Sequence, residues 1–373
     1  MHHLVVTTRP PPRCRELAAL ADEALAFHRT LPGYAPTPLH DLPALAEDLG
    51  VASLRLKDES HRFDLNAFKV LGASFAIHRW MADHPGEWRV TFTTATDGNH
   101  GRAVAWAARR LGAEAVVFIP AHASPARIAA IEAEGATVEL VEEGYDAAVR
   151  AAHEAAASEG WVAIQDTASP GYEEIPEWIA AGYWTHATEL EPLPHGPDAP
   201  DVDLVLLHAG VGTWAAAIAA YYWHRYGERR PRIAIVEPST AACVLAGALT
   251  GRPVPIDASR RTIMAGLDCA LASSTALAAL HHSVDAFFTI DDRWSLAAMR
   301  RLAMPRAGDP QVVAGESGAA GLAGLLALTS EAALEPVRRH LSLDDTSRVL
   351  VWSTEGATDP DHWAEVVGRP VPA

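Results

Sequence analysis

Short β-branched segments alternate with alanine-rich segments along much of the chain, and this alternation restricts the fold more than any other feature. Between residues 88 and 166 the segments read WRVTFTTA, GNHGRAVAWAARRLG, AEAVVFIP, SPARIAAIEAEGA, TVELVEEG, YDAAVRAAHEAAASEG and WVAIQD. The β-branched segments predict strands and the alanine-rich segments predict helices, several of which end at a glycine: Gly112, Gly135 and Gly160. Strands that alternate with helices predict a parallel sheet covered by helices.

A stretch rich in proline, aspartate and glycine interrupts this alternation: LEPLPHGPDAPDVD, residues 190–203. After it the pattern resumes with LVLLHAGVGTWAAAIAAYYW, RIAIVEP and, near the end, SRVLVWSTEG. The chain has 373 residues, whereas a single domain usually holds roughly 100–200. We therefore predict two α/β domains that are connected through this stretch.

The formal net charge of −17 argues against nucleic acid or an anionic membrane surface as a partner, because both are densely negative. Cys14, Cys243 and Cys269 are few, odd in number and without the spacing of a metal site, so we expect no metal and a reducing cytoplasm. The N-terminus lacks the apolar region of a signal peptide, and no run reaches the roughly 18 apolar residues of a membrane span. These features predict a soluble cytoplasmic protein that acts on a small molecule.

Three predicted turns carry polar or glycine residues where an open α/β sheet binds its ligands. The turn TDGNHG places Asp97 and Asn99 at the start of a helix. In HAGVGT the glycines allow close approach of the backbone, and the N–H groups that lead into the next helix suit a phosphate. Ser353 and Thr354 follow an apolar strand. Taken alone, each turn is explained at least as well by helix capping or tight packing.

Lys69 lies in RFDLNAFKVLGASFA, residues 62–76, where a helix would turn mostly apolar faces to its neighbours. Burial of an ammonium group is costly, so such surroundings favour the neutral amine, which can form a Schiff base with an aldehyde. A single lysine more often keeps its amine in water. Together with a phosphate-binding turn at 210–213 and polar groups at Asn99 and Ser353, however, Lys69 predicts pyridoxal 5'-phosphate as cofactor.

Seven segments carry a resemblance to a known family: RFDLNAFKVLGASFA, TDGNHGRAVAW, QDTASPGYEEIPEWIAAGY, HAGVGTWAAA, TIMAGLDC, GDPQVVAGESGAAGL and STEGATD. The chain resembles the fold type II (tryptophan synthase β-like) pyridoxal-phosphate enzymes, and within them the diaminopropionate ammonia-lyase family. LNAFKVLG and TDGNHGR together are specific for this branch. The resemblance implies a homodimer and two doubly wound α/β domains with mainly parallel sheets and the cofactor in the cleft between them. Residues 1–87 and 201–373 would form the large cofactor-binding domain, and residues 88–200 the small one.

The resemblance also implies which residues hold the cofactor. Lys69 would form the internal Schiff base, and Asn99 would hydrogen-bond the ring hydroxyl. Ser353 or Thr354 would face the pyridine nitrogen, and a neutral hydroxyl there suits elimination better than transamination. The implied phosphate-binding residues are Gly210, Val211, Gly212 and Thr213.

The implied reaction is the α,β-elimination of 2,3-diaminopropionate to pyruvate and ammonia through an aminoacrylate intermediate. Lys69 would remove the Cα proton from one face, and Asp97 would serve the opposite face and so the other enantiomer. Asp166 is the candidate carboxylate that holds the leaving amino group as an ammonium.

The chain departs from the family pattern in two segments. Asp64 and Ala73 stand where the family usually has glycine, and DCALASS follows TIMAGL where we expect a CGEP-like continuation. The alternative is therefore an elimination or replacement on another β-substituted alanine, as in serine or threonine dehydratases.

A non-catalytic protein that binds pyridoxal phosphate or an amino acid would have little reason to keep Lys69, Asp97 and Asp166 together. A dinucleotide-binding enzyme would need a GxGxxG after a first strand, which the sequence lacks.

Overall fold

Two β-sheets organise the computed structural model, which describes residues 2–87, 89–96, 98–142, 144–190, 200–257 and 259–372. The larger sheet has the spatial order β1 (His3–Val5), β10 (Ala286–Ile290), β9 (Arg232–Pro238), β8 (Leu204–His208), β11 (Arg348–Ser353), β3 (Ser53–Asp58) and β2 (Leu39–Asp41). The smaller sheet has the order β6 (Thr137–Val141), β5 (Glu114–Pro120), β4 (Thr91–Ala95) and β7 (Val162–Ala163). Neighbouring strands are parallel except at the two edges of the larger sheet, where β1 and β2 run antiparallel to their neighbours.

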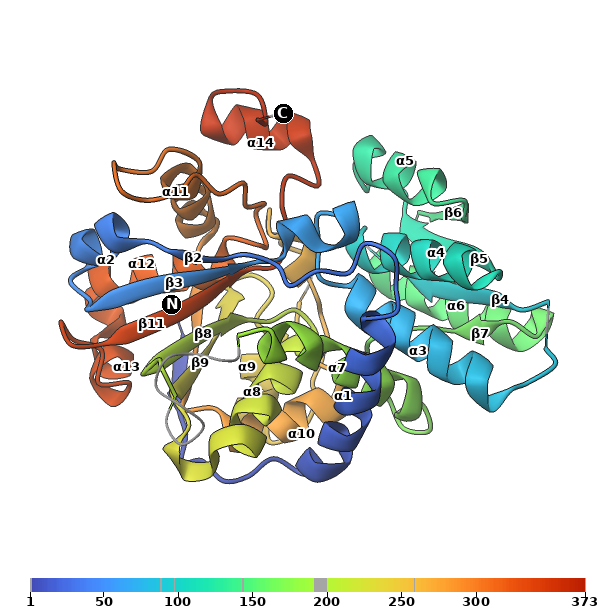
Figure 1. The fold of residues 1–373 in the computed structure, drawn as a ribbon, viewed down its shortest axis with the longest axis horizontal. Helices are drawn as coiled ribbons and strands as arrows, with labels where there is room; N and C mark the ends of the chain where they lie inside the picture. The colour runs from blue at the N-terminus through green and yellow to red at the C-terminus, as the bar shows by residue number, and fades with distance from the viewer. Residues whose placement is uncertain are drawn as a thin grey trace.

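Helices cover both faces of the larger sheet (Figure 1). Side chains of β8 alternate between two apolar cores, with Val205 and Leu207 in one and Leu204 and Leu206 in the other. The first core also takes residues from α1 (Cys14–His28), α3 (Val70–Asp83), α4 (Asn99–Leu111), α5 (Pro125–Ala133), α7 (Glu174–Thr188), α8 (Thr213–Tyr226), α9 (Cys243–Thr250) and α10 (Ser274–Ser283). The second takes residues from α2 (Pro43–Leu49), α11 (Asp292–Ala303), α12 (Ala320–Ser330), α13 (Glu335–His340) and α14 (Pro360–Val367). The sheet is therefore buried on both faces, which confirms the predicted doubly wound α/β class.

The remaining helices are short or lie on the smaller sheet. Ala148 and Ala152 of α6 (Tyr145–Glu159) pack against Ala95 at the end of β4. Short 3-10 helices are η1 (Glu59–Asp64), η2 (Gly227–Arg229), η3 (Ala265–Leu267) and η4 (Ala332–Leu334). No helix in the described ranges has the length and apolar character needed to cross a membrane.

The chain before Lys69 differs from the helix that its sequence predicts. Helix α3 begins only at Val70, and the preceding residues form η1 and an irregular turn. Three residues of this segment that are not glycine adopt a left-handed backbone: Phe63 (φ 50°), Asp64 (φ 59°) and Asn66 (φ 57°). A left-handed backbone stops a right-handed helix and normally favours glycine, so Asp64 keeps a conformation suited to the glycine of the family. Lys69 is thus placed at the N-terminal end of α3 rather than in its middle.

The strands divide between the two sheets by sequence. All four strands of the smaller sheet lie between residues 91 and 163, and those of the larger sheet lie before residue 59 or after residue 203. The division into a domain of residues 88–200 and a discontinuous domain of residues 1–87 and 201–373 stays a prediction. Most of the proline-rich stretch that suggested a connection, residues 191–199, lies outside the described residues.

Helices α3 and α7 cross with their backbones in contact, because both carry glycine at the crossing. A Cβ atom on Gly182 would lie 2.9 Å from Gly72 Cα and would overlap the Leu71 carbonyl oxygen. Alanine normally stabilises a helix interior relative to glycine by about 0.5–1 kcal/mol. We predict the opposite sign for Gly182→Ala, a loss of about 1–3 kcal/mol in unfolding free energy, because overpacking against backbone cannot relax.

Chemical denaturation of Gly182→Ala and Gly247→Ala measures this difference. A Cβ on Gly247 of α9 would come closest to the tip of the Leu277 side chain, 2.6 Å away, which can move aside, and it would lie 3.4 Å from the Arg252 carbonyl oxygen. A Gly182→Ala protein as stable as the unmodified protein would show that the two helices are not in close contact.

Candidate active site

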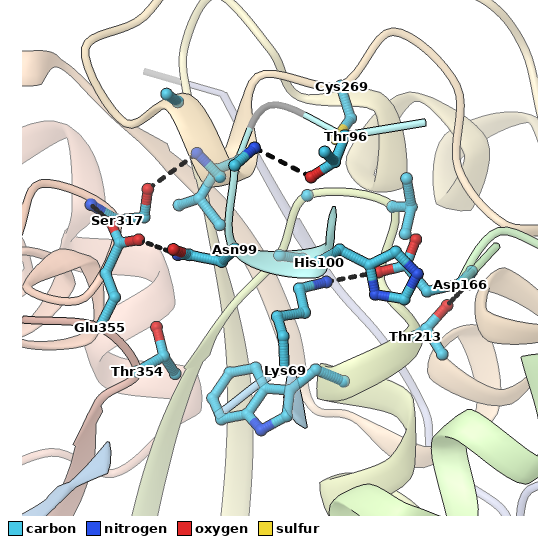
Figure 2. A pocket seen from close by; sticks show the side chains of 18 of the residues that line it. Lys69, Thr96, Asn99, His100, Asp166, Thr213, Cys269, Ser317, Thr354 and Glu355 are labelled. Atoms are coloured by element: carbon cyan, nitrogen blue, oxygen red, sulfur yellow. Dashed lines mark hydrogen bonds and ion pairs between the residues drawn. The ribbon is translucent and has the colours of Figure 1, made fainter. Parts of the chain in front are cut away.

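A pocket opens where the carboxyl ends of parallel strands from both sheets face each other (Figure 2). Its wall includes the turns after β4, β8 and β11, the residue Asp166 beyond β7, and Lys69 before α3. Five predicted site segments that lie far apart in the sequence, from Lys69 to Thr354, are thus brought together in one pocket. Asp97 lies outside the described residues, but its neighbours Thr96 and Gly98 both line the pocket.

Lys69 and Asp166 form an ion pair inside this pocket, and Figure 2 shows the lysine amine pointing toward the carboxylate. The Lys69 side chain is 20% exposed and the Asp166 side chain 6%. The Lys69 Nζ atom also lies 5.4 Å from the ring centre of Phe68 and 5.9 Å from that of Tyr183. The amine therefore lies near two aromatic rings and is held by the Asp166 carboxylate.

The charge of Lys69 is opposite to the sequence expectation of a neutral amine. Burial is the largest single effect and lowers the pKa of Lys69, but the Asp166 carboxylate together with Tyr183 and Cys269 raises it, so the pKa lies above its ordinary value. Burial likewise raises the pKa of Asp166, but the Lys69 ammonium, together with His100 and a backbone hydrogen bond, lowers it to about 2. The sequence could not show this, because the carboxylate is 97 residues away from the lysine.

This ion pair predicts a pH-dependent contribution to stability. The Asp166 pKa falls from 3.8 to about 2 on folding, so its stabilisation is complete above the higher value and is lost as the pH falls through the lower one. Asp166→Asn should reduce the unfolding free energy by about 2 kcal/mol at neutral pH, and the reduction should shrink between about pH 5 and pH 2. Denaturant titrations across this range measure it. Asp41→Asn, whose side chain is 82% exposed, is the matched control.

A difference between the unmodified and Asp166→Asn proteins that stays constant over the whole range would contradict this assignment, since it would show that the stability change does not depend on ionisation of the carboxyl group.

The turn between β8 and α8 forms a cradle for an anion. Residues 210–213 line the pocket, and within the described ranges their backbone N–H groups donate to no protein acceptor. A Cβ on Gly210 would lie 2.9 Å from the Gly266 carbonyl oxygen and 3.0 Å from Cys269 Sγ, so the turn has no room for a side chain there. Thr213 Oγ1 donates a 2.6 Å hydrogen bond to the Asp166 carbonyl oxygen and so ties the cradle to the lysine's partner. Unpaired N–H groups at a helix N-terminus fit a phosphate.

Gly212 gives this cradle its shape, because it has a φ of 96°. A Cβ there would point away from the pocket, 3.2 Å from both Val244 and Leu280. We predict that Gly212→Ala weakens phosphate-group binding about tenfold, since a left-handed alanine costs about 1–2 kcal/mol and the strain is relieved by moving the N–H groups.

Equilibrium dialysis with pyridoxal 5'-phosphate measures the effect of this change. Gly251→Ala is the control, since Gly251 also has a positive φ (73°) but lies at the far end of α9 with nothing near its Cβ. Equal losses of affinity in the two variants would show that backbone strain in general, rather than the shape of this turn, is responsible.

The opposite wall of the pocket carries Asn99 and the end of β11. Asn99 begins α4, and its Nδ2 atom donates to a Glu355 carboxylate oxygen (Figure 2). Thr354 lines the pocket, and its hydroxyl is 2.7 Å from His208 Nε2. Ser353 is fully buried, and its hydroxyl donates to the Glu355 carbonyl oxygen at 3.3 Å. Of the two hydroxyls that the sequence left open, that of Thr354 therefore reaches the pocket.

Comparison with known proteins decides the family. The family model of the pyridoxal-phosphate dependent enzymes matches residues 30–342. The diaminopropionate ammonia-lyase of Salmonella typhimurium is 40% identical over 367 residues, which cover 92% of this chain and 91% of that protein. This chain belongs to the diaminopropionate ammonia-lyase family.

Solved structures of this family agree with the fold described above. The crystal structure of the Escherichia coli diaminopropionate ammonia lyase in complex with an aminoacrylate-PLP azomethine reaction intermediate matches with a TM-score of 0.89 and 36% identity, over 98% of this chain and 96% of that one. The structure of the same lyase in complex with D-serine matches equally well. Both comparisons confirm the predicted fold type II architecture.

The residues of the pocket fit pyridoxal phosphate, the cofactor of this enzyme family. The cradle at 210–213 suits the phosphate group, Lys69 supplies an amine, and Asn99 and Thr354 supply polar groups on the other side. His208 adds a buried Nδ1 atom for which the described residues provide no partner. The pocket thus offers a complementary group for each polar part of the cofactor.

Sequence reasoning missed several polar or aromatic residues of this family's pocket: His100, Arg127, His208, Trp214 and Glu355. Burial lowers the pKa of His208 to about 3, so its imidazole is neutral beside Thr354. Four of these five residues belong to the motifs TDGNHG, HAGVGTW and STEG. They could have been identified by considering every polar or aromatic residue next to a predicted turn. Arg127 has no such signal, because it reaches the pocket from within α5.

Proposed function

We propose that this protein catalyses the pyridoxal-phosphate-dependent α,β-elimination of 2,3-diaminopropionate to pyruvate and ammonia. The observation that carries the proposal is the ion pair of Lys69 with Asp166 inside the cofactor pocket of a chain that is 40% identical to a diaminopropionate ammonia-lyase. Asp166 pairs with the Lys69 ammonium in the free protein. With a diamine bound, the same carboxylate would pair with the substrate's second ammonium group. A pocket that binds one ammonium in this way is suited to a substrate with a second amino group.

In this proposal Lys69 is the residue whose amine would hold the cofactor covalently. The sequence contains only two lysines, Lys57 and Lys69. Lys57 is 1% exposed, and its Nζ atom is 2.7 Å from both the Thr37 carbonyl oxygen and a Glu189 carboxylate oxygen. Because Lys57 is held in this buried ionic cluster and does not line the pocket, Lys69 is the lysine with access to the cofactor.

Bound pyridoxal phosphate supplies an electron sink that acidifies the Cα–H bond of the substrate. The N–H groups of the 210–213 cradle would hold the phosphate group, Asn99 would bond the ring hydroxyl, and the Thr354 hydroxyl would face the pyridine nitrogen. Neutral His208 keeps this hydroxyl oriented without adding a charge. Lys69 lines the same pocket, so its amine would be available to a substrate bound there.

The proton and leaving-group steps fall to Lys69, Asp97 and Asp166. Lys69 would take the Cα proton from one face as a neutral amine, once Asp166 pairs with the β-ammonium group of the substrate instead of with the lysine. The Asp97 carboxylate would take the proton from the other face. The Cβ–N bond breaks with its electron pair on nitrogen, so the amino group must be protonated beforehand and then leaves as ammonia. Asp166 holds it as an ammonium up to that point. The C–H electron pair becomes the Cα=Cβ double bond of aminoacrylate, which water converts to pyruvate and a second ammonia.

We also propose that the protein is a cytoplasmic homodimer with the two-domain division given above. The two sheets support the division, and the homodimer rests on the family resemblance. Cys14, Cys243 and Cys269 form no disulfide with one another, which suits a reducing compartment. Light scattering coupled to gel filtration measures the mass, and a monomer at micromolar concentration would contradict the dimer.

Product analysis of the purified protein loaded with pyridoxal phosphate tests the proposed reaction. We expect two molecules of ammonia for each pyruvate formed from 2,3-diaminopropionate, and a kcat/KM for this substrate well above that for L-serine or L-threonine. A higher kcat/KM for either hydroxy amino acid would assign the protein to the alternative eliminations instead.

A further inference from the structure

Glu355 is a buried carboxyl group that the roles described above do not use. It follows β11 by two residues, is 2% exposed and lines the cofactor pocket. One carboxylate oxygen, Oε1, accepts the backbone N–H of Ser317 at 3.1 Å. The other, Oε2, accepts the Asn99 side-chain N–H. A buried carboxyl group is costly, so one with both oxygens bonded in this pocket calls for a role.

The backbone of Glu355 is fixed as tightly as its side chain. Its carbonyl oxygen accepts the Gly315 N–H at 3.0 Å, and an isolated β-bridge joins it to Ala67, two residues before Lys69. A Cβ on Gly318 would lie 2.9 Å from the Glu355 backbone nitrogen. The carboxylate therefore has a fixed position, and it is Asn99 that must adapt to it.

The pair also connects the two sheets. Asn99 begins the helix after β4 of the smaller sheet, and Glu355 follows β11 of the larger one (Figure 2). Both donors to the Glu355 carboxylate are N–H groups. The Ser317 donor is a backbone N–H group, which cannot act as an acceptor instead. Both donors can therefore be satisfied only by a side chain with two acceptor oxygens. With one amide hydrogen given to Glu355, the second Asn99 N–H is free to point elsewhere.

We propose that Glu355 is a positioning residue for the cofactor: it fixes the orientation of the Asn99 amide so that its second N–H is presented to the ring hydroxyl. This inference rests on the role proposed for Asn99. Burial also raises the pKa of Glu355, consistent with a carboxyl group held out of water next to the cofactor. In this proposal Glu355 influences the cofactor only through its hydrogen bond with Asn99.

Glu355→Gln tests this orientation with almost no change of shape. The glutamine has one acceptor and one donor, so its oxygen meets the Ser317 N–H and its NH2 group faces Asn99. Asn99 must then turn its own oxygen toward Gln, and its hydrogen bond to the cofactor changes. We expect a different ratio of the visible to the near-ultraviolet absorption band of bound pyridoxal phosphate, because this ratio responds to hydrogen bonding at the ring hydroxyl.

Glu355→Ala and Asn99→Ala complete a double-mutant cycle. Each single change should weaken pyridoxal phosphate binding about tenfold to a hundredfold, as expected for loss of one charge-assisted hydrogen bond. In the Asn99→Ala background, Glu355→Gln should leave the band ratio unchanged. Glu316→Gln is the matched control, since Glu316 is also a buried carboxyl (3% exposed) but is paired with His362 on α14.

A purely structural Glu355 would lower the melting temperature in every background and leave the band ratio of the single Gln variant unchanged, which would overturn the proposal. So would a further shift of the ratio in the Asn99→Ala background. The spectra are recorded without substrate, so they do not depend on turnover of diaminopropionate. Failure of the proposed reaction and failure of this inference are therefore observed separately.

Discussion

Lys69→Ala should leave a folded protein whose turnover of 2,3-diaminopropionate is lower by about 10⁴-fold or more, as expected when a residue that is both nucleophile and base is lost. The change removes the amine that carries the cofactor and takes the Cα proton. The fold should persist, because Lys69 lies at the surface of the pocket and contributes no side chain to the apolar cores. Steady-state pyruvate formation measures the loss, and circular dichroism checks the fold.

Lys69→Arg separates the two roles of the lysine in this experiment. Arginine keeps a cation beside Asp166, but its guanidinium stays protonated and cannot form a Schiff base. If the lysine serves chemistry, the arginine variant is as inactive as the alanine variant while keeping the stability of the ion pair. Turnover by Lys69→Arg within about tenfold of the unmodified protein would contradict a covalent or basic role.

Asp97→Asn should abolish most activity on one enantiomer of 2,3-diaminopropionate, by a factor of about 10²–10⁴, and spare the other. The reason is that Lys69 and Asp97 are proposed to serve opposite faces of the substrate, and Asn keeps the size of Asp while losing its basicity. Separate kcat/KM values for the D and L substrates measure the asymmetry. Equal losses on both enantiomers would make Asp97 a helix cap or a cofactor-positioning residue.

Asp166→Asn is the comparator for this experiment, because it removes the other acid proposed to act. It should impair both diaminopropionate enantiomers, since both need their β-amino group held as an ammonium. A β-chloro analogue should be less affected, because chloride leaves without a proton. If the chloro and amino substrates lose activity equally, Asp166 acts on the cofactor or on Lys69 rather than on the leaving group.

The sequence predicts strands from local β-branched runs, and within the described residues it misses β1, β2, β3 and β10. β4, β5, β6, β8, β9 and β11 lie where β-branched runs predict them, and α4 and α6 end at the expected glycines Gly112 and Gly160. β7 is reduced to two residues of the predicted WVAIQD. β3 was missed because Arg55 and Lys57 interrupt its apolar residues. These charges are satisfied by Asp201 and Glu189, which no local pattern reveals.

The candidate site shows the same limit. Motif segments bring Lys69, Asn99 and the 210–213 cradle to one pocket as predicted, because turns at the carboxyl ends of parallel strands share an edge. The pairing of side chains across the pocket was not predictable. Asn99 and Glu355 are 256 residues apart, and the partner of Lys69 determines its charge. Such contacts depend on how the two sheets face each other, and a single sequence does not contain that information.

Borohydride reduction followed by peptide mapping tests the central claim most directly. The protein is purified with pyridoxal phosphate, treated with borohydride to make the carbon–nitrogen link irreversible, and digested. With only two lysines in the chain, the mapping has two candidate positions, and buried Lys57 is the internal control. We predict that the label is found on Lys69 alone. A label on Lys57, or on neither lysine, would contradict the account.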